Sequence, residues 1–410
     1  MPELYPFPGV RFTSPEVRDL VCPPYDVISS EEQDRLYARS EHNAVRIELP
    51  RAEGDDTKEE RYQRAGALFK RWLDEGVLQQ DDTAGFYVYR QDFVSPSGTR
   101  RQVTGIIGAL KLEEFGQTAG VLPHERTMPG PIEDRLTLMR ACPVNVSPIY
   151  AVYRGGARLM PWSTALENRP TAARLTDEQG ALHRLWVVHA PAELEMIYTA
   201  LADGPLVIAD GHHRYETALA YCRQQSGPGP HEALMCFCVD ADAEDLEVLP
   251  YNRVFRSQTD PKRIAGDLKE RFTTRSFARG EGEAALLESK SDHPLLFLFP
   301  DEEVLAEVAD DEVRAVVGDR DSAWRDLDVV ALHEVVFAAL FEDGIEELQF
   351  FHDAETIRSR IDAGFTGGVL LKPLRAAEVI EVAKSGERMP QKASYFWPKA
   401  LTGLVFRDLS

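Results

Sequence analysis

The strongest chemical signal in the sequence is LVIADGHHRYETAL, residues 206–219. An apolar strand is predicted to end in an Asp-Gly turn, and a helix follows directly. The residues of this corner are Asp210, Gly211, His212, His213 and Arg214. The first N–H groups of a helix lack internal partners, and glycine lets an anion approach the backbone closely. The pattern therefore predicts a phosphate-binding corner, to which the imidazoles and the guanidinium add donors.

Two alternatives to a phosphate corner stay open. In the first, Asp210 only caps the helix. In the second, the corner binds a metal ion: His212 and Glu216 are four residues apart and share a helix face, and His124 or Glu125 could complete three ligands. Asp210 and Glu216 are the metal-ligand candidates, and a metal-dependent hydrolase could use the two histidines of the corner to hold its ion.

The second signal is the HERT run, residues 124–127, inside the proline-rich segment 121–135. Glu125 is the predicted general base that takes a proton from a substrate hydroxyl, and His124 is the predicted proton relay. Arg126 and Thr127 are predicted phosphate ligands. A loop of surface salt bridges is the alternative.

The third signal is a cationic and aromatic patch near the C-terminus. Its residues are Lys392, Ser394, Tyr395, Trp397 and Lys399. Aromatic rings can stack on a nucleotide base while lysines approach its phosphates, so the patch is predicted to bind a nucleotide. The alternative is a terminal strand whose lysines lie along the core surface.

The N-terminal part contributes a rigid turn and a charged pair. The Pro-Pro turn of residues 23–24 is followed by Tyr25 and Asp26, which it would hold for substrate recognition. Residues 43–49 alternate in polarity and are predicted as a strand, with Arg46 and Glu48 facing outward as further substrate ligands. A plain turn capped by the aspartate is the alternative.

Two resemblances extend this interpretation. The ADGHHRYETAL segment resembles the phosphate-gripping corner of the ParB/sulfiredoxin-like superfamily, where a Gly-x-x-Arg motif begins a helix. That superfamily includes sulfiredoxin, which binds ATP, ParB, which binds a nucleotide, and a free-serine kinase. CPPYDVIS, HERT, ADGHHRYETAL and the tail pattern MPxKSxxFxPK together resemble an uncharacterised bacterial and archaeal domain-of-unknown-function family (number 1015). Here the tail reads MPQKASYFWPK, with Ala393 where that pattern has serine and Ser394 beside it.

Composition narrows the partners. The chain holds 46 Lys and Arg against 68 Asp and Glu, a net charge of −22, which would repel a nucleic-acid backbone. No apolar run is long enough to span a bilayer, and the first residues lack the apolar core of a signal peptide. We therefore expect a cytoplasmic protein with no nucleic-acid or membrane partner; the sequence leaves its oligomeric state open. The common nucleotide motifs GxxxxGK[ST] and GxGxxG do not occur.

The elements that must position these residues predict an α+β fold with mixed sheets. Residues 1–256 form the predicted site-bearing region, with HERT and the strand-to-helix corner. Residues 257–410 alternate between helix and strand and form a second region. A site of this kind requires the tail, residues 387–400, to return to the corner, which the sequence leaves open.

The first functional hypothesis is a nucleotide-dependent phosphotransferase that uses Mg²⁺ with ATP or ADP and acts on a small hydroxylated metabolite. Phosphoryl transfer needs mainly positioning and charge stabilisation, which these residues can provide. The superfamily resemblance implies free serine as a possible substrate. The alternatives are the metal-dependent hydrolase and a non-catalytic regulator that binds a nucleotide or metabolite.

Overall fold

The computed structural model describes residues 1–96, 98–116, 120–243, 245–341 and 344–410. The described chain forms two compact units. Unit 1 contains Met1–Pro123, Thr127–Leu246 and Pro398–Ser410, and unit 2 contains His124–Arg126 and Glu247–Trp397. Each unit has a hydrophobic cluster of its own. The predicted α+β fold with mixed sheets is confirmed.

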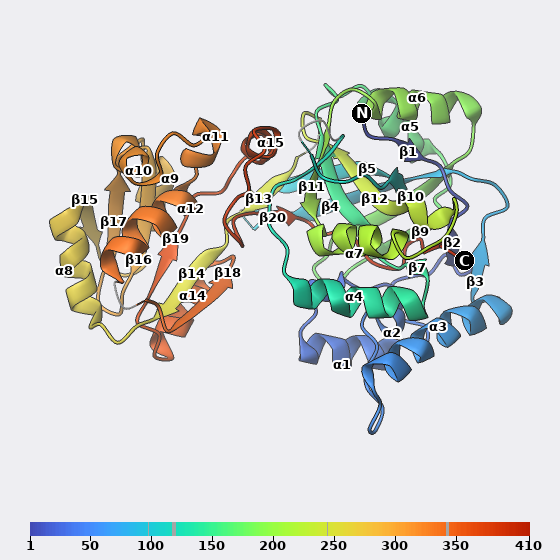
Figure 1. Cartoon of the computed structure of the whole chain (residues 1–410), viewed down its shortest axis with the longest axis horizontal. Coiled ribbons are helices and arrows are strands. Elements are labelled where there is room, and N and C mark those ends of the chain that lie inside the picture. The colour runs from blue at the N-terminus through green and yellow to red at the C-terminus, as the bar shows by residue number, and fades with distance from the viewer. Residues whose placement is uncertain (97, 117–119, 244, 342–343) are drawn as a thin grey trace. The chain divides into compact units, whose positions relative to one another are not determined.

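Unit 1 is built, in its described residues, on a nine-stranded mixed sheet (Figure 1). In spatial order its strands are β6 (Val121–Pro123), β11 (Leu206–Asp210), β8 (Ile149–Tyr153), β12 (Ala233–Asp240), β5 (Arg100–Lys111), β4 (Phe86–Val94), β10 (Leu182–Val188) and β9 (Ala173–Thr176), with β1 (Leu4–Tyr5) beside β5. Strand β11 is parallel to β6 and antiparallel to β8. Its residues 206–208 are fully buried, as the apolar sequence predicts.

Unit 1 also contains α-helices and short η helices. The elements are η1 (Tyr25–Val27), α1 (Ser30–Arg39), α2 (Val45–Glu48), α3 (Lys58–Asp74), α4 (Pro129–Ala141), α5 (Met160–Ala165), η2 (Leu166–Asn168), α6 (Pro191–Leu201), α7 (His212–Cys222) and η3 (Pro230–Glu232). Helix α4 contacts both α3 and α7 and so lies between them (Figure 1). Two short pairs, β2 (Val10–Phe12) with β3 (Leu78–Gln80) and β7 (Val144–Asn145) with β21 (Arg407–Asp408), complete the unit.

Unit 2 contains, among its described residues, a six-stranded antiparallel sheet. Its strands in spatial order are β15 (Thr273–Phe277), β17 (Glu303–Val308), β16 (His293–Leu298), β19 (Gly367–Leu370), β14 (Asn252–Arg256) and β18 (Glu347–Phe351). A separate pair joins β13 (Glu247–Leu249) to β20 (Tyr395–Trp397). The helices are α8 (Pro261–Arg271), α9 (Glu283–Glu288), α10 (Asp310–Val317), α11 (Ser322–Arg325), α12 (Asp328–Val330), η4 (Ala331–Phe337), α13 (Ala338–Leu340), α14 (Ala354–Asp362) and α15 (Ala376–Lys384).

No helix in the described ranges combines the length and apolar character needed to cross a bilayer.

The strand predicted at residues 43–49 is wrong, because Val45–Glu48 forms the short helix α2. The side chain of Asn43 explains the difference. Its Oδ1 accepts the Val45 N–H at 2.9 Å, and its amide donates to the carbonyls of Asp19 and Val21. Those carbonyls lie more than twenty residues away along the chain, so local alternation could not reveal the helical turn. Glu48, predicted to face outward, is 4% exposed.

The division into units differs from the sequence-based boundary at residue 256. Strands β13 and β14 belong to unit 2, where β14 pairs with β18 and β19 inside the sheet. The tail also divides, because the residues up to Trp397 belong to unit 2 and those from Pro398 onward belong to unit 1. Sheet pairing between distant segments sets both limits.

Candidate functional site

The strand-to-helix corner of unit 1 has the predicted local geometry. Strand β11 ends at Asp210, Gly211 has a φ of 92°, and α7 begins at His212. A Cβ on Gly211 would lie 2.8 Å from Ile149 and 3.0 Å from the Nε of Arg214. The left-handed backbone and this close approach both require glycine. The corner is therefore determined by one residue type at one position.

Asp210 lies between two cations of unit 1. Its carboxylate accepts from Arg214 at 2.6 Å and forms an ion pair with Lys399. Burial by itself raises the pKa of the Asp210 carboxyl, but Lys399 and Arg214 outweigh burial and lower the pKa to about 2. The N-cap residue of α7 is Gly211, so Asp210 does not occupy the cap position and its interpretation as the helix cap is wrong. The lysine side chain returns to the corner from the C-terminal tail, and the amide of Gln91 holds its backbone carbonyl at 2.9 Å.

Asp26 is the second carboxylate of the corner. It lies in the short helix η1 directly after the Pro-Pro turn, and part of its surface is exposed. Desolvation by the surrounding protein and the nearby charge of Asp210 raise the pKa of the Asp26 carboxyl. Desolvation and Asp26 likewise raise the pKa of Tyr25 to about 12. The two aspartates thus have pKa values shifted in opposite directions.

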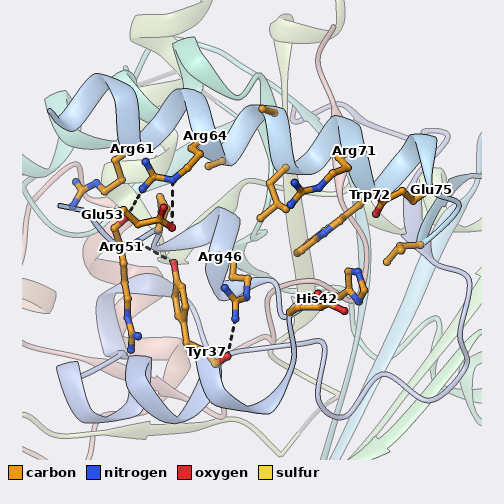
Figure 2. Close-up of a pocket in the computed structure, with 16 residues that line it drawn as sticks. Tyr37, His42, Arg46, Arg51, Glu53, Arg61, Arg64, Arg71, Trp72 and Glu75 are labelled. Atoms are coloured by element: carbon orange, nitrogen blue, oxygen red, sulfur yellow. Dashed lines mark hydrogen bonds and ion pairs between the residues drawn. The ribbon is translucent and has the colours of Figure 1, made fainter. Parts of the chain in front are cut away.

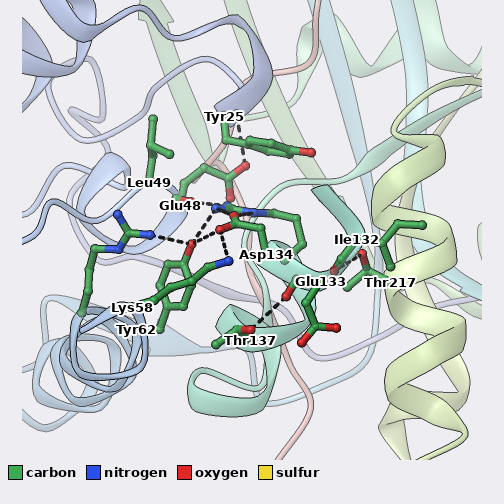
Figure 3. A network of polar contacts seen from close by, with 12 residues as sticks. Tyr25, Glu48, Leu49, Lys58, Tyr62, Ile132, Glu133, Asp134, Thr137 and Thr217 are labelled. Carbon is green, nitrogen blue, oxygen red and sulfur yellow. Dashed lines mark hydrogen bonds and ion pairs between the residues drawn. The ribbon is translucent and has the colours of Figure 1, made fainter. Parts of the chain in front are cut away.

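Glu48 connects the Pro-Pro turn to the corner. Its Oε1 accepts the backbone N–H of Tyr25 at 3.3 Å and the hydroxyl of Ser147 at 2.8 Å. Ser147 in turn accepts from Arg214 at 3.2 Å. A buried relay therefore runs from the turn that carries Asp26 to the guanidinium that holds Asp210 (Figure 3 shows the Glu48 end).

Arg214 has its contacts within unit 1. Besides Asp210 and Ser147 it donates to the carbonyl of Pro148 at 2.5 Å, and its side chain is 9% exposed. Its Nε is buried with no hydrogen-bond partner among the described residues. The burial of the guanidinium is offset by Asp210 and Asp26, which raise its pKa. Arg214 therefore has a structural role that the sequence did not indicate, and its phosphate-binding role stays a prediction.

A second polar network fixes α2, α3 and α4 to one another (Figure 3). Asp134 accepts from Tyr62, Lys58 and Arg135 at 2.8, 2.8 and 2.5 Å. Burial raises the pKa of Asp134, but these partners, led by Lys58, outweigh it and lower the pKa to about 2. Arg135 also donates to the Glu48 carbonyl at 2.7 Å and lies 4.4 Å above the Tyr25 ring. The network thereby supports the turn that carries Asp26.

A small cavity of about 40 Å³ lies between these two networks. The polar side chains among its lining residues are Tyr25, Glu48, Arg135, Asn145, Ser147, Arg214 and Thr217. That volume accommodates ordered water but no substrate. Sequence reasoning missed Ser147 as a member of the site. Its signal was a pair of polar residues, Asn145 and Ser147, that flank Val146 shortly before the apolar strand β8.

The start of α7 holds the segment that follows HERT. The Met128 N–H donates to Nε2 of His213 at 3.0 Å, and the Thr127 hydroxyl donates to Glu216 at 2.7 Å. His212 is buried at the first position of the helix. No group of three or more His, Cys, Asp or Glu side chains that could hold a metal ion occurs in the described ranges. The metal set drawn from His212, Glu216 and HERT is therefore not assembled there.

The rest of HERT and most of the tail patch meet in unit 2. His124 is 1% exposed, and its Nε2 lies 2.9 Å from the Ser394 hydroxyl. Glu125 bridges to Met389 and its Oε1 accepts the Ala393 N–H at 3.4 Å. The structure therefore brings His124 and Glu125 together with the tail, although the family pattern's serine is replaced by Ala393.

Lys392, Arg126 and Arg46 have different surroundings. The Lys392 ammonium lies 5.0 Å above the Tyr251 ring, and its carbonyl accepts from the buried Arg253 at 3.0 Å. Burial lowers the pKa of Arg253 to about 9. Arg126 contributes to lowering the pKa of Glu387, after Arg320. Arg46 donates to carbonyls at the end of α1, so it does not form the predicted outward pair with Glu48.

The described site is a strand-to-helix corner on an α+β fold. A family model described as "Protein of unknown function (DUF1015)" matches residues 4–330. The chain belongs to this family, as its motifs predicted. No functionally curated protein matches it.

Three solved structures are similar over most of their length. A free serine kinase in complex with AMP is 14% identical, with 70% of this chain and 89% of that chain covered and a TM-score of 0.36. SbnI with a C-terminal truncation, from Staphylococcus aureus, is 11% identical, with 73% and 87% covered and a TM-score of 0.39. A conserved hypothetical protein from Pyrococcus furiosus is 13% identical, with 68% and 87% covered and a TM-score of 0.35. Similarity of this degree does not define a mechanism.

Proposed function

We propose that the protein is a phosphotransferase that moves a phosphoryl group from ATP or ADP to a small hydroxylated metabolite, with its reaction centre at the corner of Asp26, Asp210 and Lys399. The observation that carries the proposal is the charged corner: the Asp210 carboxylate contacts both Arg214 and Lys399, and Asp26, whose surface is exposed, is close enough for the charge of Asp210 to act on it. The opposite pKa shifts of the two aspartates agree with this proposal. Neighbouring carboxylates whose pKa values are driven apart have distinct acid–base roles in many enzymes.

Each group has a role in this proposal. Asp26, with an exposed surface and a raised pKa, takes the proton from the substrate hydroxyl. The hydroxyl oxygen forms the new bond to phosphorus, while the bond between phosphorus and the leaving nucleotide oxygen breaks. Lys399, held by Asp210, stabilises the charge on the transferred group. Glu48 is a positioning residue, because it acts on Asp26 through the Tyr25 N–H.

Mg²⁺ is proposed to accompany the nucleotide, since one or two carboxylates and the phosphates are its usual ligands. When bound, the ion would neutralise phosphate charge. Glu125 remains the alternative base predicted from the sequence, and the substitution experiment below compares the two directly.

The test has two stages. Calorimetric titration with ATP and ADP, each with and without Mg²⁺, measures binding. Phosphorus NMR then follows phosphoryl transfer to a panel of hydroxylated metabolites that includes L-serine, which the superfamily resemblance implies. We expect Mg²⁺-dependent nucleotide binding and at least one phosphorylated product. Absence of both nucleotide binding and product would contradict the proposal.

Asp26→Asn is the sharpest variant. We expect turnover to fall by about a hundredfold or more with nucleotide affinity nearly unchanged, because a general base contributes that much to rate. Asp19→Asn, an exposed aspartate in the same N-terminal segment, is the matched control and should keep its turnover. If Glu125→Gln abolishes turnover and Asp26→Asn does not, the base is Glu125.

The stability of Asp26→Asn separates a functional role from a structural one. A pKa that is raised in the folded state means that the ionised form of Asp26 destabilises the folded protein. This loss of stability is complete above the pKa of the folded state and is absent below the pKa of the unfolded state. The neutral amide should therefore be more stable than the wild type at pH 7, and the difference should vanish near pH 3. Loss of stability at pH 7 would identify a structural carboxylate.

A non-catalytic nucleotide-binding regulator is the second candidate. The observation in its favour is that the corner's Asp210 is already neutralised by Lys399 and Arg214, so a ligand could bind without being turned over. Nucleotide binding without phosphorylated product, together with wild-type affinity in Asp26→Asn, would favour this candidate.

A further inference from the structure

A groove lined by arginines lies in unit 1, and none of the corner residues Asp26, Asp210 and Lys399 lines it (Figure 2). Its volume is about 920 Å³, within the range of sites for small molecules. It lies between α1, the segment 50–53 and one face of α3. The charged side chains among its lining residues are Arg46, Arg51, Arg61, Arg64, Arg71, Glu41, Glu53 and Glu75. We name this cavity the arginine groove.

Helix α3 presents its arginines on the face that lines the groove. Arg61, Arg64 and Arg71 are spaced by three and seven residues, which places them on one side of a helix. The adjoining face carries the buried residues Tyr62, Ala65, Gly66, Phe69 and Trp72, of which Ala65 and Trp72 also line the groove. The core therefore determines which way the arginines face.

Three of the five guanidiniums have no carboxylate partner in the described part of the chain. Arg51 pairs with Asp34, and Arg64 pairs with Asp56 at 2.6 Å and contacts Glu53 at 3.6 Å. The three without a carboxylate are Arg46, Arg61 and Arg71. The lining thus holds five guanidiniums and three carboxylates in a protein whose net charge is −22.

The contacts of these three arginines show that no carboxylate of the described residues neutralises their charge. Within the described ranges, Arg46 donates only to main-chain carbonyls, of Ser40 and Tyr37, at 3.1 and 2.8 Å. Arg61 donates to the Tyr62 hydroxyl at 3.0 Å, and its Nε is buried with no hydrogen-bond partner in the part of the chain that the structure describes. Arg71 is exposed and forms no ion pair within the described residues. Each leaves positive charge that an anion could neutralise.

The arginines at one end of the groove are held in place before any ligand arrives. The Tyr37 ring has Arg46 at 4.4 Å and Arg51 at 4.1 Å from its centre. Arg64 donates to the carbonyl of Arg51 at 2.8 Å. Side chains that are already ordered lose less entropy on binding, which favours affinity.

We propose that the arginine groove binds a linear polyanion made of successive phosphoryl groups. Arg61 and Arg71 are ten residues apart on α3, which corresponds to roughly 15 Å along the helix axis. A single phosphate cannot contact both ends, whereas a chain of phosphoryl groups can. The planar guanidinium donates two parallel hydrogen bonds to phosphate oxygens, which a lysine-lined site could not do.

An acidic peptide is the competing occupant, and the groove suits it less well. None of the lining residues belongs to a strand, so no strand edge is available to pair with an extended peptide backbone. The three lining glutamates would also repel carboxylates that are spread along a peptide. A chain of phosphoryl groups concentrates its charge where the guanidiniums are.

The test is calorimetric titration of the full chain with tripolyphosphate at low ionic strength, with orthophosphate and hexaglutamate in parallel. We expect tripolyphosphate to bind more tightly than orthophosphate and hexaglutamate, and added salt to weaken it. Arg71→Gln and Arg61→Gln should each weaken tripolyphosphate binding by about tenfold or more, the usual loss for a charge-assisted contact. Arg71→Lys should recover only part of the affinity.

Two further variants test whether tripolyphosphate affinity follows the charge of the lining and whether the change is confined to the groove. Glu75→Gln, in the lining, should strengthen tripolyphosphate binding severalfold. Lys70→Gln is the matched control: it removes the same charge from the same helix but lies outside the lining, so affinity should change by less than about twofold. These surface variants should unfold at wild-type temperatures, which a thermal scan verifies.

The proposal is overturned if tripolyphosphate does not bind, if orthophosphate or hexaglutamate binds as tightly, or if Lys70→Gln weakens binding as much as Arg71→Gln. Tripolyphosphate could also reach the corner of Asp26 and Lys399. Binding that is unchanged in both arginine variants would place it there and would overturn the groove assignment without affecting the proposed phosphotransfer.

Discussion

In the corner of unit 1, the buried charges have opposite charges of the protein beside them: Asp210 contacts both Lys399 and Arg214. In the arginine groove of the same unit, the guanidiniums of Arg61 and Arg71 have no carboxylate partner among the described residues. Both regions are rich in charge, but only the first balances its charge internally.

This difference indicates what each region can do. An internally balanced cluster can set the protonation of its members, because fixed partners act on them whether or not a ligand is present. Asp26 and Asp210 illustrate this, with pKa values shifted in opposite directions. A cluster with surplus charge is suited to attracting a counter-charge from solution. The corner is thus better suited to chemistry and the groove to binding.

The largest expected effect comes from breaking the internal balance of the corner. Lys399→Met leaves Asp210 buried with one partner fewer, and removal of one member of a buried pair costs about 3–5 kcal/mol. Urea unfolding should show this loss. The double variant Lys399→Met/Asp210→Asn should lose less than the sum of the two single losses, because the charges are removed together.

The groove supplies the contrast to that experiment. Arg71→Met removes an exposed charge without an ion-pair partner in the described chain, so its effect on unfolding should stay within about 0.5 kcal/mol. Equal losses in Lys399→Met and Arg71→Met would remove the distinction between the two regions.

Backbone strain from a substituted glycine should also cost more stability in the corner than in the segment before α3, but the difference should be smaller than for the charge substitutions. Gly211 in the corner and Gly54 in the segment between α2 and α3 both have positive φ, of 92° and 61°. A methyl group at Gly54 meets nothing within 4 Å, whereas at Gly211 it meets Ile149 and Arg214. We expect Gly54→Ala to cost about 1 kcal/mol and Gly211→Ala about 3 kcal/mol, because strain and overpacking add. Similar costs in chemical denaturation would show that the corner can relax around the methyl group.

The last comparison in this series is the pH dependence of stability. The pKa of the Asp210 carboxyl is lowered to about 2 from an ordinary value near 3.8. The ionised Asp210 therefore contributes fully to the stability of the folded state above pH 3.8, and this contribution is lost as the pH falls through the lowered pKa. The difference corresponds to about 2 kcal/mol. Wild type should lose this amount relative to Asp210→Asn between pH 4 and pH 2. Parallel pH profiles of the two proteins would contradict the ion pairs of Asp210.

Local sequence was sufficient to predict the corner itself. The apolar run before Asp210, a glycine at the turn and a polar helix start are all neighbours in the chain, so the strand, the turn and α7 could be read directly. The return of the tail was left open, and the structure brings Lys399 to Asp210 across 189 residues. Contacts at that separation leave no local pattern.

Residues with distant partners were where sequence reasoning failed. The alternation at residues 43–49 suggested a strand, but Asn43 bonds to carbonyls of another segment and the chain turns into α2. That helix turns Glu48 inward to Tyr25 and Ser147. The arginine spacing on α3 was visible in the sequence, but a groove exists only because α1 and the segment before α3 form its other walls.

The sequence by itself determined the α+β character, the glycine-dependent corner and the family, because apolar periodicity, turn chemistry and motifs are local properties. The tertiary structure alone decided which carboxylate is held ionised and which has a raised pKa, because the field at Asp26 and Asp210 depends on Arg214 and on Lys399 from the far end of the chain. Electrostatic interaction depends on distance in space, and only folding sets that distance.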